Sequence, residues 1–196
     1  MGITTEGEAM ILAQFQTVGH DLFTRGLISS HTGNLSIRLG ERIIITRRDS
    51  KLGCLDEHDL IETGISRNDR ATPLASTELS VHRAIYQETS ASAIVHAHSP
   101  HAVALSLVET EIVPSRAEGL SVVGQVPVLG WHMELGEGEL ADIIAQALQQ
   151  HRIIMVHGHG SFAIGQLLEE AHNYTAILEE SCRVICLLRT LQISPG

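Results

Sequence analysis

Two histidines, His96 and His98, lie two residues apart at the end of an apolar segment, residues 93–98, that predicts a buried strand. Alternate residues of a strand point to the same face, so both imidazoles leave it together. Two imidazoles placed in this way can share one metal ion, with zinc–nitrogen bonds of about 2.0–2.1 Å. The alternative is a pair of polar residues on a half-exposed strand. The small Ala97 between them and the apolar surroundings favour the metal ligands.

A third ligand has to come from another part of the chain. The segment His157-Gly158-His159-Gly160 offers two candidates, because its glycines allow tight backbone geometry. Three histidines would leave an open coordination position, which is typical of catalytic rather than structural zinc. Harder cations prefer more carboxylates, so the pattern favours Zn²⁺ or a similar late divalent ion.

Metal chemistry of this kind also needs an acid or base, and Glu78 is the candidate. Ser76-Thr77-Glu78 opens a predicted helix just before the histidine strand. Hydroxyls and free amides at a helix start can receive an anion. A carboxylate at such a position is often only a partner of the helix dipole. A divalent ion nearby would keep Glu78 ionised and able to accept a proton.

The elements that must position these residues follow from hydrophobic periodicity. Helices are predicted over residues 6–25, 78–88, 138–151 and 167–191, and strands over 35–38, 42–46, 93–98, 126–129, 153–156 and 161–164. Ser99, with an N-cap hydroxyl, and Pro100 predict the start of one more helix. Residues 47–76 are predicted to be mainly loop, with a short strand. The pattern predicts one domain over residues 1–196, a layered α/β/α sandwich with a mostly antiparallel or mixed central sheet.

Charge and composition exclude several other classes of protein. A formal net charge of −10 disfavours a phosphate-backbone binder, and 3% aromatic residues disfavour stacking on single-stranded nucleic acid. No apolar run approaches the length of a membrane span, and the first residues lack a signal-peptide pattern. The three cysteines cannot all pair, which fits a reducing compartment. We therefore expect a cytoplasmic protein with a small-molecule partner.

Four segments together resemble the class II aldolase/adducin family, nearest to its fuculose-phosphate aldolase branch. They are Thr-Gly-Asn-Leu-Ser at 32–36, Ser-Thr-Glu at 76–78, His-Ala-His-Ser-Pro-His at 96–101 and His-Gly-Ser-Phe-Ala-Ile-Gly at 159–165. Their order and spacing agree with the family and cover most of the chain. The His-x-His-x-x-His segment with an upstream carboxylate is the most specific of the four.

The resemblance implies a zinc aldolase that cleaves a ketose 1-phosphate, such as fuculose 1-phosphate, through a metal-stabilised enediolate. Dihydroxyacetone phosphate and an aldehyde would be the products. It also implies a homotetramer with active sites at the subunit interfaces. Glu78 would bind zinc at rest and then carry the substrate proton. The implied zinc ligands are His96, His98 and His159, and the implied phosphate pocket contains Gly33, Asn34, Ser76 and Thr77.

Three features depart from the family pattern. The usual Ile-Thr-Pro-Ser/Thr-Gly loop is replaced by residues 45–50, with Arg47 and Arg48, which could bind an anion through their planar donors or lie on the surface. Residues 113–118 lack the family's tyrosine acid, for which Glu118 is a possible substitute. The chain stops at Gly196, so we expect a short or missing tail at the neighbouring site.

Several alternatives stay open. His82 or His101 could support the site without binding the metal. The same zinc triad could serve a 4-epimerase, a sugar-acid phosphate decarboxylase or a dehydratase on this scaffold. A non-catalytic interaction module of the adducin type is disfavoured because the three histidines and the carboxylate are all present. Metal storage or a structural zinc site is disfavoured because it would favour a closed four-ligand site.

Overall fold

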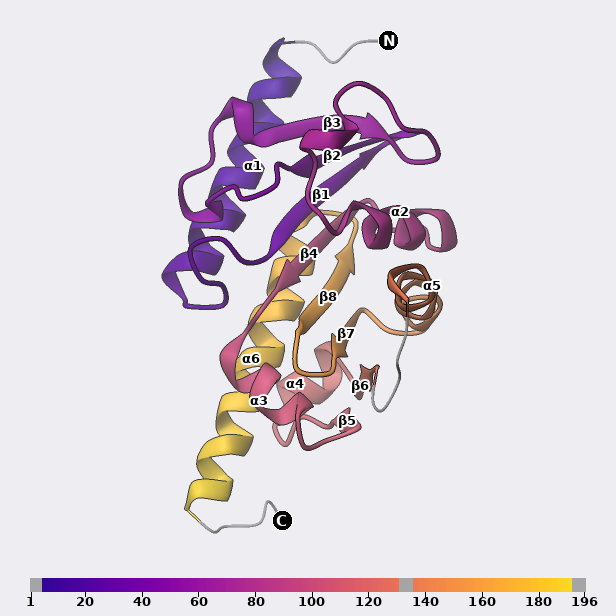
Figure 1. Cartoon of the computed structure of the whole chain (residues 1–196). Helices are drawn as coiled ribbons and strands as arrows, with labels where there is room; N and C mark the ends of the chain where they lie inside the picture. The colour runs from indigo at the N-terminus through magenta and orange to yellow at the C-terminus, as the bar shows by residue number, and fades with distance from the viewer. Residues whose placement is uncertain (1–4, 131–135, 192–196) are drawn as a thin grey trace.

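The computed structural model describes residues 5–130 and 136–191 of the chain, which Figure 1 draws as ribbon. Its α-helices are α1 (Thr5–Thr24), α2 (Leu79–Glu88), α3 (Pro100–Ser106), α4 (Ala117–Val122), α5 (Glu137–Ala147) and α6 (Leu168–Thr190). Its strands are β1 (Asn34–Leu39), β2 (Arg42–Thr46), β3 (Leu60–Gly64), β4 (Ala93–Ala97), β5 (Glu111–Ile112), β6 (Val126–Leu129), β7 (Ile153–Val156) and β8 (Gly160–Gly165). In this part of the chain no helix is long and apolar enough to cross a membrane.

The eight described strands form one sheet in the order β3-β2-β1-β4-β8-β7-β6-β5. Only β6 and β7 pair in parallel among these neighbours, so the predicted mixed and mostly antiparallel sheet is confirmed. The hairpin of β1 and β2 turns at Gly40, whose φ of 58° is accessible to glycine at little cost. The sequence analysis missed β5 and α4, because segments this short carry no measurable periodicity.

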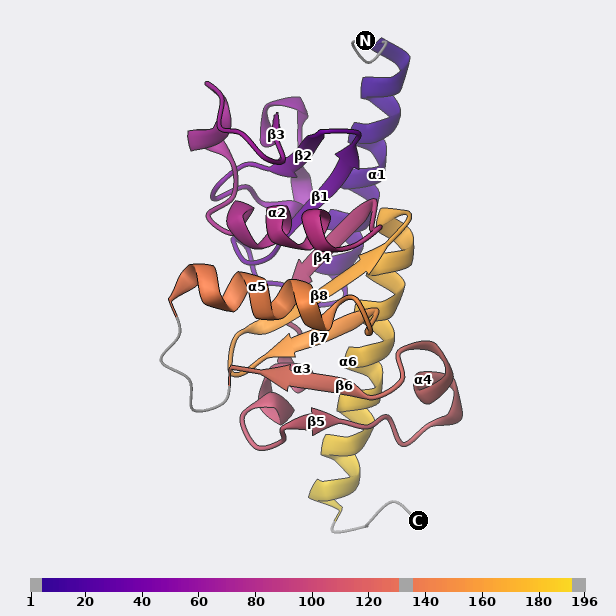
Figure 2. The same cartoon turned by 90° about the vertical axis from the view of Figure 1, so that its right-hand side faces the viewer.

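Helices cover both faces of the sheet. Figures 1 and 2 show α1 and α6 on one face and α2 and α5 on the other. Each face has its own core, and β4 contributes to both because its side chains alternate. Val95 packs in the core beneath α1 and α6, whereas Ile94 packs in the core beneath α2 and α5. His96 therefore points to the same side as Ile94, toward the start of α2.

The end of β4 differs from the prediction in two ways. The strand ends at Ala97, so His98 lies one residue beyond it, immediately before the turn into α3. Ser99 does precede α3, but its hydroxyl makes no capping hydrogen bond, so the predicted cap was wrong. Instead the Glu179 carboxylate of α6 accepts hydrogen bonds from the backbone N–H groups of His101 at 3.1 Å and Ala102 at 3.0 Å. A carboxylate from a neighbouring helix thus replaces the local hydroxyl.

Candidate metal centre

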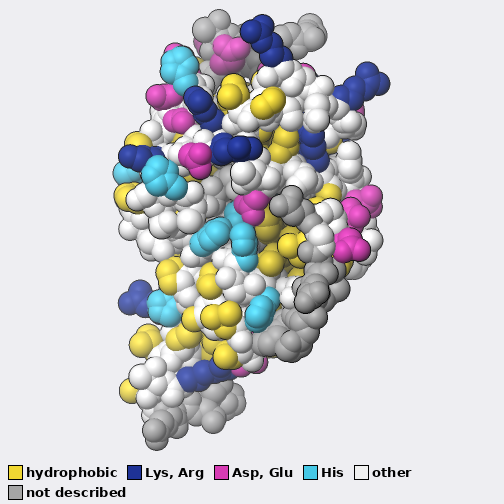
Figure 3. All heavy atoms as spheres, viewed as in Figure 1, with side chains coloured by type: hydrophobic (Ala, Val, Ile, Leu, Met, Phe, Trp, Pro, Cys, Tyr) yellow, Lys and Arg dark blue, Asp and Glu magenta, His cyan; other side chains and the backbone are white. Residues whose placement is uncertain are grey.

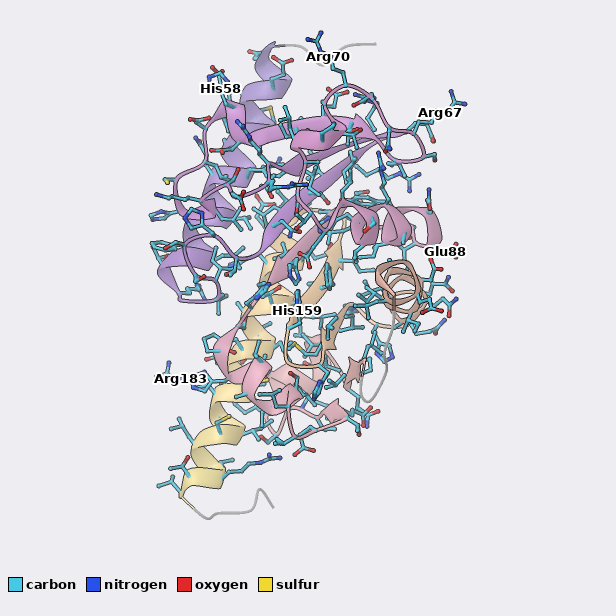
Figure 4. The ribbon with its side chains drawn as sticks, in the orientation of Figure 1. His58, Arg67, Arg70, Glu88, His159 and Arg183 are labelled. Carbon is cyan, nitrogen blue, oxygen red and sulfur yellow. The ribbon has the colours of Figure 1, made fainter. Side chains whose placement is uncertain are left out.

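Three imidazoles converge at the middle of the sheet. His96 comes from β4, His98 follows that strand, and His159 lies in the turn between β7 and β8. The Nε2 atom of His96 lies 2.8 Å from Nε2 of His98 and 3.3 Å from Nε2 of His159. Figure 4 labels His159 near the centre of the molecule, beside β4 and β8. These three residues form the group of described side chains that could hold a metal ion.

Two glycines make this approach possible. Gly158, at the tip of the β7–β8 turn, has a φ of 65°, which a larger residue adopts only with strain. Gly160 faces β4, where a Cβ atom would lie 2.5 Å from the carbonyl oxygen of Ala97 and 3.1 Å from Cε1 of His96. A side chain at residue 160 would therefore push β8 away from the imidazoles.

Glu78 completes the group from the start of α2. Its Oε2 lies 3.0 Å from Nε2 of His96, and its Oε1 lies 3.1 Å from Nε2 of His159. Donor atoms of a tetrahedral zinc site with bonds of about 2.0–2.1 Å are separated by roughly 3.3 Å. The four separations given above, 2.8 to 3.3 Å, lie at or somewhat below this value, so the three nitrogens and the Glu78 carboxylate can gather around one divalent cation.

A hydrogen bond behind His96 selects the tautomer that a metal needs. Nδ1 of His96 lies 2.9 Å from the carbonyl oxygen of Ser161. Because a carbonyl only accepts, Nδ1 must carry the proton, and Nε2 then offers its lone pair to the centre of the site. The ring of His96 also stacks on Phe162, with 4.1 Å between the centroids. Both contacts fix the ring orientation before any cation binds.

Protonation states favour cation binding. Full burial lowers the pKa of His96 to about 3, and partial burial together with the charge of His159 lowers the pKa of His98. Burial alone would raise the pKa of Glu78, but the neighbouring His96 and hydrogen bonds from His159 and Asn34 outweigh it and lower that pKa. Near neutral pH the site thus presents two neutral imidazoles and an ionised carboxylate, the forms that bind metal ions.

A pocket of about 220 Å³ opens beside the imidazoles. All four predicted substrate residues, Gly33, Asn34, Ser76 and Thr77, line it together with Glu78. Asn34 has a second contact, since its Nδ2 donates a 2.6 Å hydrogen bond to Oε2 of Glu78. In Figure 3 the histidines form a cyan group in the centre of this face, with acidic side chains at its edge and basic side chains above it. The remaining lining residues are His31, Thr32, Arg47, Arg48, Asp49, Ser50, His98 and His159.

The sequence profile of the Class II Aldolase and Adducin N-terminal domain matches residues 13–186. The chain belongs to this family. Its members include metal-dependent aldolases, and the three imidazoles described above could hold the metal.

Similar proteins within the family are lyases. An L-fuculose phosphate aldolase of Methanococcus maripaludis is 30% identical over 185 residues, covering 93% of this chain and all of the relative. A 3-oxo-tetronate 4-phosphate decarboxylase of Pectobacterium atrosepticum is 30% identical and covers 90% of this chain and 84% of the relative. The solved structure of L-fuculose-1-phosphate aldolase from Thermus thermophilus superposes with a TM-score of 0.88 at 36% identity, covering 96% and 99% of the two chains. This class II aldolase family member is therefore an enzyme, a lyase with the class II aldolase fold.

Two histidines near the site have other partners. His82 is fully buried, and its Nδ1 lies 2.6 Å from the Ser36 hydroxyl, so it braces β1 and makes no hydrogen bond to the Glu78 carboxylate. His101 pairs with Glu179 at 2.7 Å. Neither residue lines the pocket beside the imidazoles.

Glu118, the possible substitute for the tyrosine acid, lies away from the site, and the sequence analysis missed three residues that lie at or behind the site. Glu118 is exposed on α4, forms an ion pair with Arg116 at 3.4 Å and does not line this pocket. The sequence analysis missed Ser161 and Phe162 as supports of His96, because nothing in their types distinguishes them from ordinary strand residues. It also missed His31, whose Nδ1 lies 3.1 Å from the carbonyl oxygen of Asp49.

Proposed function

We propose that the chain is a zinc-dependent aldolase that cleaves a ketose 1-phosphate of the fuculose 1-phosphate type into dihydroxyacetone phosphate and an aldehyde. The observation that carries the proposal is the Glu78 carboxylate, held within 3.0 and 3.1 Å of two imidazoles of the triad at the edge of a polar pocket. A metal-binding group beside a proton carrier is what carbon–carbon cleavage next to a carbonyl requires. The fuculose-phosphate aldolases at 30% and 36% identity support the same reaction.

His96, His98 and His159 would hold the Zn²⁺ ion, since neutral imidazoles suit a late divalent cation. When bound, zinc supplies a fixed positive charge that stabilises negative charge on the substrate oxygens as the bond breaks. Ser161 contributes by keeping the Nδ1 proton of His96 on the side away from the cation.

Glu78 would carry the proton, and its surroundings explain how its basicity changes. At rest its pKa is lowered by His96, His159 and Asn34, so the carboxylate is ionised. A Glu78 side chain turned toward the substrate would leave these partners, and its pKa would then rise from the lowered value. In the condensing direction Glu78 would remove a proton from carbon, and in the cleaving direction it would return that proton to release dihydroxyacetone phosphate.

Gly33, Asn34, Ser76 and Thr77 would contribute to the substrate phosphate pocket. Gly33 has a φ of 79°, and a Cβ there would lie 2.6 Å from the carbonyl oxygen of His96, so only glycine lets this loop approach β4. Ser76 and Thr77 precede α2, where the helix dipole favours an anion.

We also propose that the enzyme is a cytoplasmic homotetramer with its sites at subunit interfaces. Large apolar side chains are exposed around α3, α4 and the end of α6, which supports burial against other subunits. They include Leu107, Val108, Val113, Leu120, Leu187 and Leu191. Light scattering of the purified protein tests the assembly, and a monomeric mass would contradict it.

A second candidate is decarboxylation of a sugar-acid phosphate. The Pectobacterium relative has this activity in its name and is as similar in sequence as the fuculose-phosphate aldolase of Methanococcus. The same triad would serve both reactions, so the substrate decides between them.

The test combines metal analysis with assays of bond cleavage. We expect about one zinc per chain, and release of dihydroxyacetone phosphate from fuculose 1-phosphate or ribulose 1-phosphate by the wild type. Glu78→Gln, which keeps the shape but cannot carry the proton, should fold normally and release none. Glu88→Gln, at the far end of the same helix and away from His159 in Figure 4, is the matched control and should behave as wild type. A zinc-loaded wild type that cleaves neither substrate would reject the aldolase and direct the assay to carbon dioxide release from sugar-acid phosphates.

A further inference from the structure

The turn that follows β2 brings two arginines to the pocket beside the imidazoles. Arg47 and Arg48 both line it, and both are exposed. Neither side chain has an ion pair or a hydrogen bond within the described residues. Arg42 and Arg83 are engaged, since Arg42 pairs with Glu62 and Asp69, and Arg83 donates to the carbonyl oxygen of Gly64. Arg67 and Arg70 extend into solvent away from the pocket (Figure 4), so Arg47 and Arg48 differ from them by lining it. Two guanidinium groups are thus left available at the rim of a site that already holds a carboxylate.

The backbone of this turn is held firmly although the arginine side chains are not. The N–H of Arg47 donates to the carbonyl oxygen of Asp59 at 2.7 Å, and the N–H of Arg48 donates to that of Leu74 at 3.0 Å. Asp49 has a φ of 62°, and its carbonyl oxygen accepts a hydrogen bond from His31 at 3.1 Å. The two arginines are therefore presented from a fixed frame, which lowers the entropy lost when a ligand binds.

Most other polar side chains of the pocket already have partners. The Ser50 hydroxyl donates to Asp59 at 2.7 Å. The Thr32 hydroxyl contacts Ser29. The loop after β2 consequently offers an incoming anion few hydroxyl donors, and its available donors are the guanidinium groups.

We propose that Arg47 and Arg48 are specificity-determining residues that bind the terminal phosphate of the substrate. This inference rests on the proposed function, because it assigns a phosphate monoester to the same pocket. Two guanidinium groups balance the charge of a phosphate dianion, and their planar donors match its oxygens in pairs. A carboxylate carries one charge and would need one arginine. The pocket therefore selects a phosphorylated sugar over a neutral one by charge as well as by shape.

The test measures binding separately from catalysis. Glycerol 3-phosphate is titrated calorimetrically at low ionic strength into the purified full chain, into Arg47→Ala, Arg48→Ala and the double variant. Each single substitution should weaken binding roughly tenfold and the double variant more, since one charge-assisted contact is lost each time. Arg67→Ala combined with Arg70→Ala is the control. These arginines extend into solvent from the loop after β3 in Figure 4, and removing them changes the net charge equally.

Two further ligands, glycerol and glycerate, identify the group that is recognised. Glycerol should bind with the same low affinity to every variant. If glycerate binds as tightly as glycerol 3-phosphate and loses as much affinity in the variants, the assignment to phosphate is overturned. An equal loss of affinity in the control pair would indicate a long-range electrostatic effect rather than direct contact, and would overturn the proposal. Unchanged affinity of the double variant for glycerol 3-phosphate would overturn it as well.

The two proposals fail separately. If the wild type cleaves no ketose 1-phosphate, but its affinity for glycerol 3-phosphate depends on both arginines, the aldolase proposal is wrong and the phosphate site stands. If the wild type cleaves a ketose 1-phosphate and the double substitution leaves the KM unchanged, the aldolase proposal stands and the role of the two arginines is wrong.

Discussion

The hydrogen bond from Asn34 to Glu78 makes a quantitative prediction about the pH range of activity. Asn34→Ala removes a 2.6 Å hydrogen bond to an ionised acceptor whose side chain is 23% exposed. Such a bond contributes about 1.5–3 kcal/mol, which corresponds to about one to two pKa units. Because Asn34 stabilises the ionised form, its loss raises the pKa of Glu78. The acid limb of the rate profile should therefore move to higher pH by about one to two units.

Because the pKa of Glu78 lies below its usual value, initial rates of ketose 1-phosphate cleavage are followed from about pH 3 to neutral pH, with zinc content determined on the same samples. Asn173→Ala, an exposed asparagine on α6, is the matched control and should leave the acid limb in place. A variant of Asn34 that keeps its zinc and its wild-type acid limb would refute the argument that this hydrogen bond holds the carboxylate ionised. A shift to lower pH would refute its sign.

Three further predictions concern the same region. His159→Ala should abolish stoichiometric zinc binding, whereas His157→Ala should retain it in metal analysis, because only the former belongs to the triad. Gly160→Ala should lower zinc content and destabilise the fold by about 1–3 kcal/mol in urea unfolding, because its Cβ would lie 2.5 Å from the Ala97 oxygen. Burial lowers the pKa of His82 to about 4, below the 6.5 of the unfolded chain, so the unfolded state binds more protons between these values and stability falls as pH falls. His82→Gln should reduce this loss, by up to about 3 kcal/mol over that range, in urea titrations with chelator.

The strand that carries His96 was predictable from sequence because β4 is apolar apart from that histidine and is followed by Pro100. The spacing of His96 and His98 predicted their common direction, and the structure brings both to within 2.8 Å of each other. Choosing His159 over His157 needed the family resemblance, since both residues flank the same glycine.

Contacts between distant segments could not be predicted in this way. Asn34 lies opposite His96 in the register of β1 and β4, and this pairing is what brings it to Glu78, 44 residues away in the chain. No local pattern encodes that register. Glu179 capping α3 is a similar case, because Ser99 satisfies every local rule for an N-cap while the carboxylate comes from α6.

The position of β8 has a consequence for synthesis of the chain. This strand lies between β4 and β7, yet it is made after β4, β5, β6 and β7. One edge of the fully buried β4 therefore stays unpaired while roughly 60 residues are added, about 3–12 s at ordinary translation rates. An open apolar edge pairs readily with other chains. Changes that weaken β8 should accordingly appear first as insoluble protein on rapid expression, and slower synthesis at low temperature should recover it.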